Sequence, residues 1–351
     1  MKPLLHPVLV NGRFGDPALY VECMFERWAL LLDLGDLHAL SPRKLLRIQD
    51  VFVSHTHIDH FVGFDQLLRV LIGRDQTIRL FGPLGIIERV EHRLAGYSWN
   101  LVERYATDLV FRITEVRAPN QAIGATFRFQ NRFRREDGGN RALADGLLCE
   151  DHGFSVRCAL LEHRLPCLGF AIEERQHVNV WKSRLDERGL PVGPWLREVK
   201  EAVLSGKPDD TPCPVRWREA GAARERTLSL GELKRDVLRI VPGQKIGYVV
   251  DTAYTPENVR RIVELVRGAD ILFIEAAFAR ADAALAADRA HLTTEQAGRI
   301  ARLAGAKRVE PLHFSPRYGE ADEPLLREVD EAFGAPVDSA AGQESANSKP
   351  S

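Results

Sequence analysis

Four side chains of the types that bind metal ions lie close together in the segment His55-Thr56-His57-Ile58-Asp59-His60. Imidazole and carboxylate groups are the ligands that suit zinc and its neighbours in the first transition row. Buried polar side chains need hydrogen-bond partners or ions, because burial without compensation costs free energy. Three imidazoles and a carboxylate in one short segment therefore predict a metal site.

Ligand-type residues recur at the ends of other predicted strands. Short apolar runs predict buried strands at residues 51–53, 154–161, 245–250, 271–274 and 308–312. The residues that follow them are the histidine cluster, His163, Asp251, Glu275 and His313. In α/β folds the side chains at strand ends converge and carry binding and chemistry.

These ligand types divide into two sets with one carboxylate between them. One ion could be held by His55, His57 and His163, a second by Asp59, His60 and His313, and both could share Asp251. Two ions about 3.5–4 Å apart hold the attacking and leaving oxygens of a phosphoryl displacement, and bound water with a pKa near ~7 supplies hydroxide. Such a centre suits hydrolysis of a phosphodiester.

Two further features leave two interpretations open. Asp33 ends a strand predicted at residues 28–33, where it would either support the metal histidines from behind or cap a turn. Arg132, Arg134 and Arg135 precede residues 136–140, which we predict to be a turn or a flexible tip. The arginines would either contact phosphate or form a solvated face, which is the commoner role of such a run.

The composition is that of an ordinary globular protein. Of the 351 residues 45% are hydrophobic and 28% are charged, and the formal net charge is −1, so an RNA contact has to come from a local patch. The five scattered cysteines include no C-x-x-C, which argues against a disulfide framework or a zinc ribbon. With no apolar stretch long enough to span a bilayer, we expect a cytoplasmic protein without membrane contact.

A long segment from residue 174 to residue 242 lacks a hydrophobic period and predicts only one helix, at residues 195–204. An insertion of this kind in a compact domain is more often a functional arm than core. The last third is regular, with helices predicted at residues 256–267, 291–304 and 323–333. Small polar residues from about 337 onward predict disorder.

Together these motifs resemble the metallo-β-lactamase fold superfamily and, more narrowly, the ribonuclease Z family of tRNA 3′-end endonucleases. The resemblance covers about residues 51–318. Besides the histidine cluster it rests on Glu162-His163-Arg164-Leu165-Pro166, Gly247-Tyr248-Val249-Val250-Asp251-Thr252, Ile274-Glu275-Ala276-Ala277-Phe278 with Ala290-His291-Leu292-Thr293-Thr294, and Leu312-His313-Phe314-Ser315-Pro316-Arg317-Tyr318.

A fold and a cofactor follow from this resemblance. The fold would be an α+β, four-layer αββα sandwich over residues 1–337, with an arm inserted at about residues 175–242 and a disordered tail at 338–351. The cofactor would be two zinc ions held by the two ligand sets and by Asp251, although manganese or iron would suit the same ligands. The resemblance also implies a homodimer.

The resemblance further implies roles for single residues. Asp59, His291 and Glu275 would be catalytic, with His291, held by Glu275, protonating the leaving 3′ oxygen. Ser315 and Arg317 would lie beside the scissile phosphate. As an alternative, Glu275 and His291 would be a helix-cap contact and a surface histidine.

Some parts of the chain depart from the family pattern. Residues 9–16 stand where the family has a Gly-Thr-containing strand and turn, residues 33–36 are a reduced form of its acidic, glycine-rich segment, and residues 132–135 belong to an extra insertion. The arm is longer than expected, although residues 189–194 are similar to the Gly-Pro segment that grips the tRNA elbow. Every predicted ligand matches, so the departures concern substrate binding.

The sequence therefore predicts a dinuclear zinc phosphodiesterase that cleaves the 3′ trailer of precursor tRNA by means of a metal-activated water. The tRNA would be recognised by its shape and its phosphates. One alternative is a hydrolase of small phosphodiesters, such as cyclic nucleotides, on the same site. Others are a non-catalytic RNA- or partner-binding protein and a hydrolase of thioesters or lactones.

Overall fold

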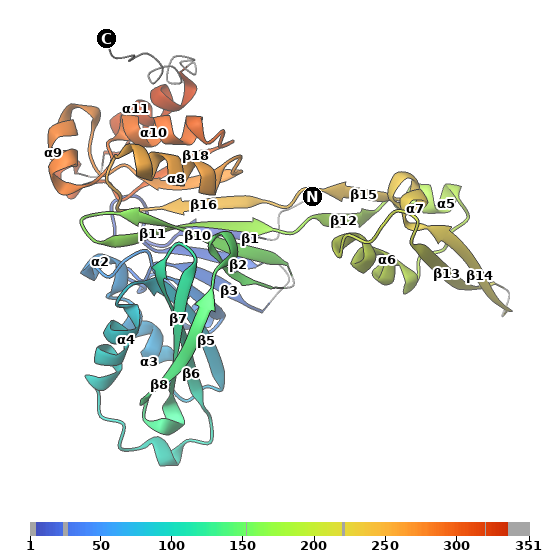
Figure 1. Ribbon diagram of the computed structural model, residues 1–351, viewed down its shortest axis with the longest axis horizontal. Helices are drawn as coiled ribbons and strands as arrows, with labels where there is room; N and C mark the ends of the chain where they lie inside the picture. The colour runs from blue at the N-terminus through green and yellow to red at the C-terminus, as the bar shows by residue number, and fades with distance from the viewer. Residues whose placement is uncertain (1–4, 24–26, 152, 220–221, 320, 336–351) are drawn as a thin grey trace, which may run out of the picture. The chain divides into compact units, whose positions relative to one another are not determined.

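The computed structural model describes residues 5–23, 27–151, 153–219, 222–319 and 321–335 (Figure 1). The chain divides into two compact units. Unit 1 comprises residues 1–151, 155–172 and 245–351, and unit 2 comprises residues 152–154 and 173–244. The arm predicted at residues 175–242 falls within unit 2, and the tail predicted at residues 338–351 lies outside the described residues.

An eight-stranded sheet forms one half of unit 1, with its strands in chain order. They are β1 (Leu5–Leu9), β2 (Leu19–Cys23), β3 (Ala29–Leu32), β4 (Ile48–Phe52), β5 (Gln76–Pro83), β6 (Leu109–Ala118), β7 (Gln121–Arg128) and β8 (Arg135–Ala142). The strands β3 to β6 run parallel, with Leu32, Phe52 and Phe81 side by side. Their carboxyl ends therefore meet at one edge, where the chain leaves β4 for the histidine cluster.

The second sheet has six strands in the order β18-β17-β16-β11-β10-β9. They are β9 (Leu147–Glu150), β10 (Phe154–Glu162), β11 (Pro166–Glu174), β16 (Lys245–Val249), β17 (Ile271–Glu275) and β18 (Val309–Leu312). The strands β16, β17 and β18 are parallel, with Val249 beside Ile274 and Glu275 beside Leu312. This register brings Asp251, Glu275 and His313 to the same edge of the sheet.

Helices cover the outer faces of both sheets (Figure 1). The first sheet carries α1 (Pro42–Leu45), α3 (Phe64–Leu71) and α4 (Ile86–Ala95), and the second carries α8 (Pro256–Val266), α10 (Thr294–Leu303) and α11 (Glu323–Gly334). Two short helices, α2 (Ile58–Phe61) and α9 (Ala283–Arg289), flank the strand ends. The inner faces meet in a core where the rings of Phe52 and Phe170 are 5.7 Å apart. The predicted αββα sandwich is thus confirmed.

Single turns of 3₁₀ helix complete unit 1. They are η1 (Val102–Arg104), η2 (Phe129–Asn131), η3 (Ala144–Gly146), η4 (Arg280–Asp282) and η5 (Pro316–Tyr318). The last of these, η5, lies shortly after β18 and sets the directions of the side chains of Pro316 to Tyr318.

Unit 2 has a hydrophobic core of its own. It contains two antiparallel pairs, β12 (His177–Val180) with β15 (Leu238–Val241) and β13 (Pro212–Glu219) with β14 (Ala222–Ser229), and the helices α5 (Lys182–Glu187), α6 (Trp195–Leu204) and α7 (Leu230–Asp236). Trp195 packs with Leu185, Val215 and Leu233. The helix predicted at residues 195–204 is confirmed, but the expectation of irregular structure around it was wrong. The missed elements are short and rich in charged residues, so their apolar period is weak.

Residues 136–140, predicted to be a turn, belong instead to β8, an edge strand paired with β7. Every residue of β8 is exposed. The strand therefore lacks the alternation of apolar and polar residues by which a half-buried strand is recognised in a sequence. Its charged side chains suit an exposed edge, because they discourage pairing with another chain.

No disulfide joins the cysteines, all five of which lie in the described ranges and are buried. This confirms that the protein has no disulfide framework. Burial raises the pKa of the Cys149 and Cys158 thiols to about 12, so both stay protonated. None of the helices in the described ranges has the length and apolar character that crossing a membrane requires.

Close packing of α10 on α11 gives a stability prediction. A Cβ at Gly298 would overlap the carbonyl oxygen of Val329 and lie 2.8 Å from the Cβ of Ala332. We expect Gly298→Ala to lower the free energy of unfolding by roughly 1–3 kcal/mol in urea titrations, because overpacking forces the helices apart. Gly334→Ala is the matched control, since a Cβ there meets nothing within 4 Å. Equal stability of the two variants would contradict the close approach.

Candidate metal centre

The histidine cluster begins in the loop after β4 and continues into α2. His55 and His60 are fully buried, Asp59 is partly exposed and His57 is exposed. The ring centroid of His55 lies 4.4 Å from that of His57 and 4.1 Å from that of His60. One short segment thus supplies several ligand-type side chains to a single place.

The strand ends of the second sheet supply the remaining groups. His163 follows β10, Asp251 follows β16 and His313 follows β18. The Oδ2 atom of Asp251 lies 3.3 Å from Nε2 of His55 and 3.5 Å from Nε2 of His60. It also lies 3.4 Å from Nε2 of His163, while Oδ1 lies 2.7 Å from Nδ1 of His313. Asp251 therefore stands among imidazoles that come from both sheets.

The predicted ligands gather in two groups, within each of which the ligand atoms lie no more than 4.8 Å apart. The groups are His55, His57, His163 and Asp251, and Asp59, His60 and His313. A third, overlapping group consists of Asp251, Glu275, His291 and His313. The structure thus brings all the predicted ligands together, in the division suggested by the sequence.

Several buried atoms of the cluster lie within ion-pair distance of other atoms in it, yet none makes an aligned hydrogen bond to a residue that the structure describes. They are Nε2 of His55, Nε2 of His60, Oδ1 of Asp251 and Nδ1 of His313. Buried polar atoms in proteins are nearly always paired, so four exceptions in one place need an explanation. Imidazole nitrogens and a carboxylate oxygen are ligands for a divalent cation of the first transition row. The residues present therefore fit a bound metal.

Without a metal ion, charge interactions keep protons on some imidazoles and off the carboxylate. Burial works to lower the pKa of His313, but Asp251 outweighs it and raises that pKa to about 10. Burial works to raise the pKa of Asp251, but His313 and His60 hold it well below its usual value. Burial lowers the pKa of His57 and His163. A divalent cation would displace the bound protons, because metal ligands must be deprotonated.

A fully buried carboxylate, that of Asp33, supports the cluster from behind. Its Oδ2 accepts hydrogen bonds from the hydroxyls of Ser54 at 2.8 Å and Tyr248 at 2.9 Å, and lies 2.9 Å from Nδ1 of His60. Its Oδ1 accepts the backbone N–H of Ser54 at 2.6 Å. Binding Nδ1 leaves Nε2 of His60 for a ligand role. Of the two interpretations of Asp33, the structure favours support of the metal histidines.

The backbone is strained at five residues of this region, which include Arg164 and Ala290 and three residues whose side chains belong to the cluster or support it. Asp33, Asp251 and His313 have φ of 59°, 50° and 61°, in the left-handed region that residues other than glycine rarely adopt. Such a conformation costs on the order of 1–3 kcal/mol for each residue and collects at functional sites. The surroundings therefore hold these side chains in positions that relaxed strands would not give them.

His291 and Glu275 lie beside the cluster. The Oε2 atom of Glu275 is 2.8 Å from Nδ1 of His291, and its Oε1 accepts the backbone N–H of Thr252 at 2.6 Å. Burial works to lower the pKa of His291, but Glu275 outweighs it and raises that pKa. The alternative of a helix-cap contact does not fit, because Thr293 and Gln296 cap α10. A surface histidine does not fit either, since the His291 side chain is only 17% exposed.

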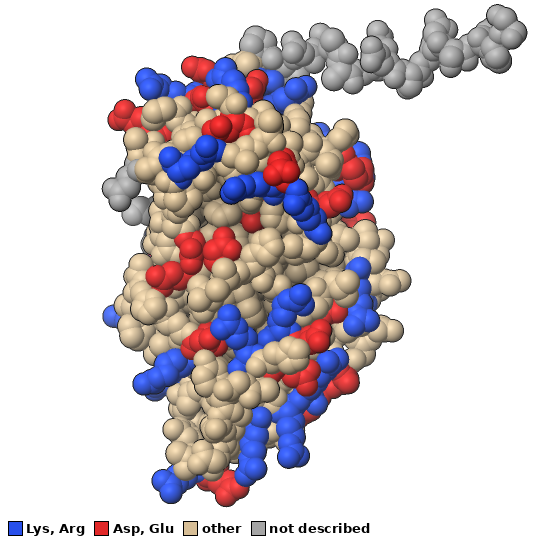
Figure 2. Space-filling view, turned by 90° about the vertical axis from the view of Figure 1, so that its left-hand side faces the viewer, with Lys and Arg blue, Asp and Glu red and all other residues tan. Residues whose placement is uncertain are grey.

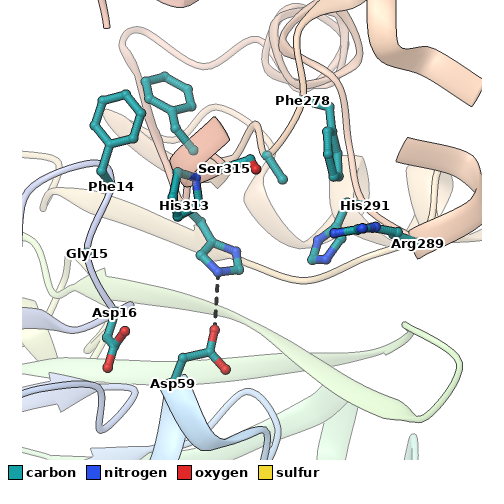
Figure 3. Close-up of a pocket in the computed structure, with 12 residues that line it drawn as sticks. Phe14, Gly15, Asp16, Asp59, Phe278, Arg289, His291, His313 and Ser315 are labelled. Carbon is teal, nitrogen blue, oxygen red and sulfur yellow. Dashed lines mark hydrogen bonds and ion pairs between the residues drawn. The ribbon is translucent and has the colours of Figure 1, made fainter. Parts of the chain in front are cut away.

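Two cavities adjoin the cluster, one of about 400 Å³ and one of about 210 Å³. Asp59, Arg289, His291 and His313 line both. Figure 3 shows the smaller cavity, with Asp59 at one side and the two histidines at its centre.

The two residues predicted to lie beside the phosphate differ in position. Ser315 lines the smaller cavity (Figure 3), whereas Arg317 lines neither cavity. The 3₁₀ turn η5 directs Arg317 toward Asp282, 3.7 Å away, and over the ring of Tyr318. The structure therefore brings only one of the two to the centre.

Arg289, which the motifs did not single out, lies at the centre instead. It ends α9, lines both cavities and has no ion pair with any described residue. Arg164 lines the larger cavity and donates to the backbone oxygen of Asp288. Guanidinium groups in this position can bind phosphate oxygens. The only signal in the sequence was that Arg289 precedes His291 by two positions.

Charges of both signs are interspersed over the face drawn in Figure 2. The arginine-rich segment follows the same pattern, since Arg132 pairs with Glu103 at 3.1 Å and Arg135 pairs with Asp137 at 2.6 Å. Two of the three arginines, Arg132 and Arg135, are therefore neutralised by carboxylates at the surface, which favours the solvated-face interpretation of that segment.

Comparisons with known proteins bear on the fold and the centre. Residues 214–314 match the Beta-lactamase superfamily domain. The metallo-β-lactamase fold protein YhfI from Bacillus subtilis is similar with a TM-score of 0.52 at 15% identity, over 93% of this chain and 92% of that one. The short form of human tRNase Z is similar with a TM-score of 0.50 at 19% identity, over 90% of this chain and 92% of that one. The fold and the ligand groups define a metal-dependent hydrolase of the metallo-β-lactamase superfamily.

Two curated relatives narrow this class. The ribonuclease Z of Deinococcus radiodurans is 34% identical over 313 residues, which cover 87% of this chain and 88% of that protein. The ribonuclease Z of Synechocystis is 29% identical over 332 residues, which cover 92% and 85%. The chain belongs to the ribonuclease Z family, and the predicted resemblance is confirmed.

The Asp33 contacts give a prediction for the centre. Tyr248→Phe removes one donor from a buried carboxylate, so we expect the free energy of unfolding of the metal-free protein to fall by about 1–3 kcal/mol in urea titrations. Because His60 is held by the same carboxylate, zinc affinity should fall at least about tenfold in a chelator competition. The exposed Tyr254→Phe is the control and should change stability by no more than about 0.5 kcal/mol. Unchanged stability and affinity in Tyr248→Phe would refute the supporting role.

Proposed function

We propose that this protein is a dinuclear zinc endoribonuclease that removes the 3′ trailer from precursor tRNA. The observation that carries the proposal is the position of Asp251 between two groups of ligand atoms, with His291 beside it. Its Oδ1 lies 2.7 Å from Nδ1 of His313 and 3.9 Å from Nδ1 of His291. Membership of the ribonuclease Z family supports the choice of RNA as substrate.

The ligand groups are assigned to two ions. In this proposal His55, His57 and His163 would hold one zinc ion, Asp59, His60 and His313 would hold the other, and Asp251 would serve both. When bound, two such ions supply Lewis-acid polarisation of the phosphate and a nucleophile at neutral pH. Manganese or iron would suit the same ligands, so metal analysis of the purified protein decides among them.

His291 donates a proton to the leaving 3′ oxygen. Glu275 raises the pKa of the imidazole above its usual value, which favours the protonated form that a general acid requires. Glu275 holds the ring through Nδ1 and is itself held by the backbone N–H of Thr252, which leaves Nε2 of His291 as the proton donor. Asp59 lines both cavities, where it orients the attacking water.

Ser315 and Arg289 bind the phosphate in this proposal. Ser315 offers a hydroxyl in the smaller cavity, and Arg289 borders both cavities beside His291. A guanidinium can hold two phosphate oxygens through parallel N–H groups. Arg289 thus takes the role that the motif had given to Arg317, whose charge faces Asp282.

The leaving group gives the sharpest test of the general acid. A ribose 3′ oxygen needs a proton, whereas the nitrophenolate released from bis(p-nitrophenyl) phosphate leaves without one. We expect His291→Gln to lower kcat on a 3′-extended precursor tRNA by about 10²–10⁴-fold, and to lower hydrolysis of the small diester by less than tenfold.

Control measurements distinguish the proposed endoribonuclease from the alternative functions. The exposed His38→Gln should match the wild type on both substrates, and the zinc content of His291→Gln should be unchanged. Equal losses on the two substrates would refute the acid role. Cleavage of the small diester alone by the wild type would identify a small-substrate phosphodiesterase. Cleavage of neither, with zinc bound, would identify a binding protein.

The arm gives a second test. Its residues 189–194 connect α5 to α6, and we assign them to contact with the tRNA elbow. His177 and Val241 are paired across β12 and β15, so the ends of the excised segment lie side by side. Removing residues 177–241 should abolish cleavage of precursor tRNA while bis(p-nitrophenyl) phosphate is still hydrolysed. Loss of both activities with zinc still bound would contradict the division between arm and centre.

A further inference from the structure

The smaller cavity lies directly beside the ligand groups, and two of the predicted ligands, Asp59 and His313, form part of its wall. It shares these two residues, and also Arg289 and His291, with the larger cavity. Its remaining walls come from the loop at residues 14–16, from residues 277–278 and from residues 314–316. A group bound there would lie next to the imidazole that donates the proton.

The loop that forms one wall is held firmly in place. The side-chain amide of Asn11 donates to the backbone oxygens of Asp16 and Asp36, both at 2.8 Å. The backbone N–H of Phe314 donates to the oxygen of Arg13 at 2.9 Å. This loop is the part of residues 9–16 in which the chain departs from the family pattern. The departure from the family pattern therefore lies in the wall of a cavity beside the metal centre.

Aromatic rings stand on two sides of this cavity (Figure 3). Phe14 packs edge-on against Phe314, with 5.4 Å between ring centroids. Phe278 lies on the other side, 5.9 Å from the ring of His291, but it is only 3% exposed. The polar groups around them are the hydroxyl of Ser315 and the carboxylate of Asp16. Aromatic faces with a few polar groups suit a nucleobase, because every base has a face that can stack.

The position of His291 determines which of the two nucleosides beside the cleaved bond would bind in the smaller cavity. Hydrolysis forms a bond between water oxygen and phosphorus, and the proton that the attacking water loses passes to solvent. It breaks the bond from phosphorus to the 3′ oxygen and transfers a proton from His291 to that oxygen. The ribose that carries the 3′ oxygen must therefore lie on the side of the phosphate nearest His291. His291 lines both cavities, but of the two only the smaller one has phenylalanine rings in its wall, so we assign the ribose and its base to the smaller cavity.

We propose that the smaller cavity binds the nucleoside whose 3′ oxygen is released, with its base stacked against the partly exposed ring of Phe14. For precursor tRNA this is the last nucleoside that remains on the product. The inference rests on the proposed function for its substrate. It adds a base-binding subsite that accepts all four bases, because stacking is tolerant of sequence.

Abasic substrates test the subsite. The probes are precursor tRNAs that lack the base either immediately upstream or immediately downstream of the cleaved bond. Stacking of one base is worth about 1–3 kcal/mol, so the upstream lesion should lower kcat/KM by roughly 5- to 150-fold. The downstream lesion should change it by less than about twofold. Equal effects of the two lesions would overturn the proposal.

A variant of Phe14 tests whether the loss of kcat/KM caused by the upstream lesion arises in this cavity. Phe14→Leu keeps an apolar side chain but removes the ring, so the upstream lesion should cost this variant much less than it costs the wild type. Phe333→Leu is the matched control, because Phe333 is a partly buried ring in α11, outside the cavity. It should keep the full upstream penalty. An undiminished penalty in Phe14→Leu would overturn the subsite even if the precursor is cleaved normally.

A second measurement is independent of tRNA. Adenosine 3′-monophosphate carries its phosphate on the 3′ oxygen, as the upstream nucleoside does before cleavage. Adenosine 5′-monophosphate carries its phosphate on the 5′ oxygen instead. The 3′ isomer should inhibit hydrolysis of bis(p-nitrophenyl) phosphate roughly 5- to 150-fold more tightly, and Phe14→Leu should remove most of the difference. If tRNA is not cleaved but the isomers differ in this way, the proposed substrate fails and the subsite stands. Equal inhibition by the isomers would overturn the subsite.

Discussion

One buried carboxylate, that of Asp33, ties the two sheets together beneath the metal centre. It binds Ser54 and His60, which follow β4 of the first sheet, and Tyr248 from β16 of the second. A buried carboxylate is tolerated when its lone pairs are nearly all used. The contacts that satisfy Asp33 also orient His60, so the geometry of the ligands depends on how the sheets pack.

A second constraint comes from the crowding of imidazoles around Asp251. In the metal-free protein the negative carboxylate and the protonated imidazoles attract one another, which is why the pKa of His313 is raised and that of Asp251 lowered. Bound cations would take the place of those protons, so metal content, proton binding and folding are linked. The left-handed backbone at Asp251 and His313 adds strain that only well-packed surroundings can support.

The ligands could be predicted because each lies next to a short apolar strand, and parallel strands end at a common edge. His163 and His313 are far apart in sequence yet meet for this reason. Arg289 could not be predicted, since nothing local to an alanine-rich helix indicates a cavity. Arg317 matched a motif, but η5 and Asp282 set its direction. The strand β8 and most of unit 2 were missed because their residues are charged or exposed and carry no strong apolar period.

Unit 2 is inserted between two strands, β11 and β16, that are neighbours in the second sheet. The chain enters and leaves it through the paired strands β12 and β15. Among the described residues its strands β12 to β15 pair only with one another, and no ligand group found there includes one of its side chains. A segment joined in this way can be lengthened, shortened or replaced over evolutionary time while the catalytic apparatus is inherited unchanged. Substrate range and chemistry can then diverge as separate modules within one gene.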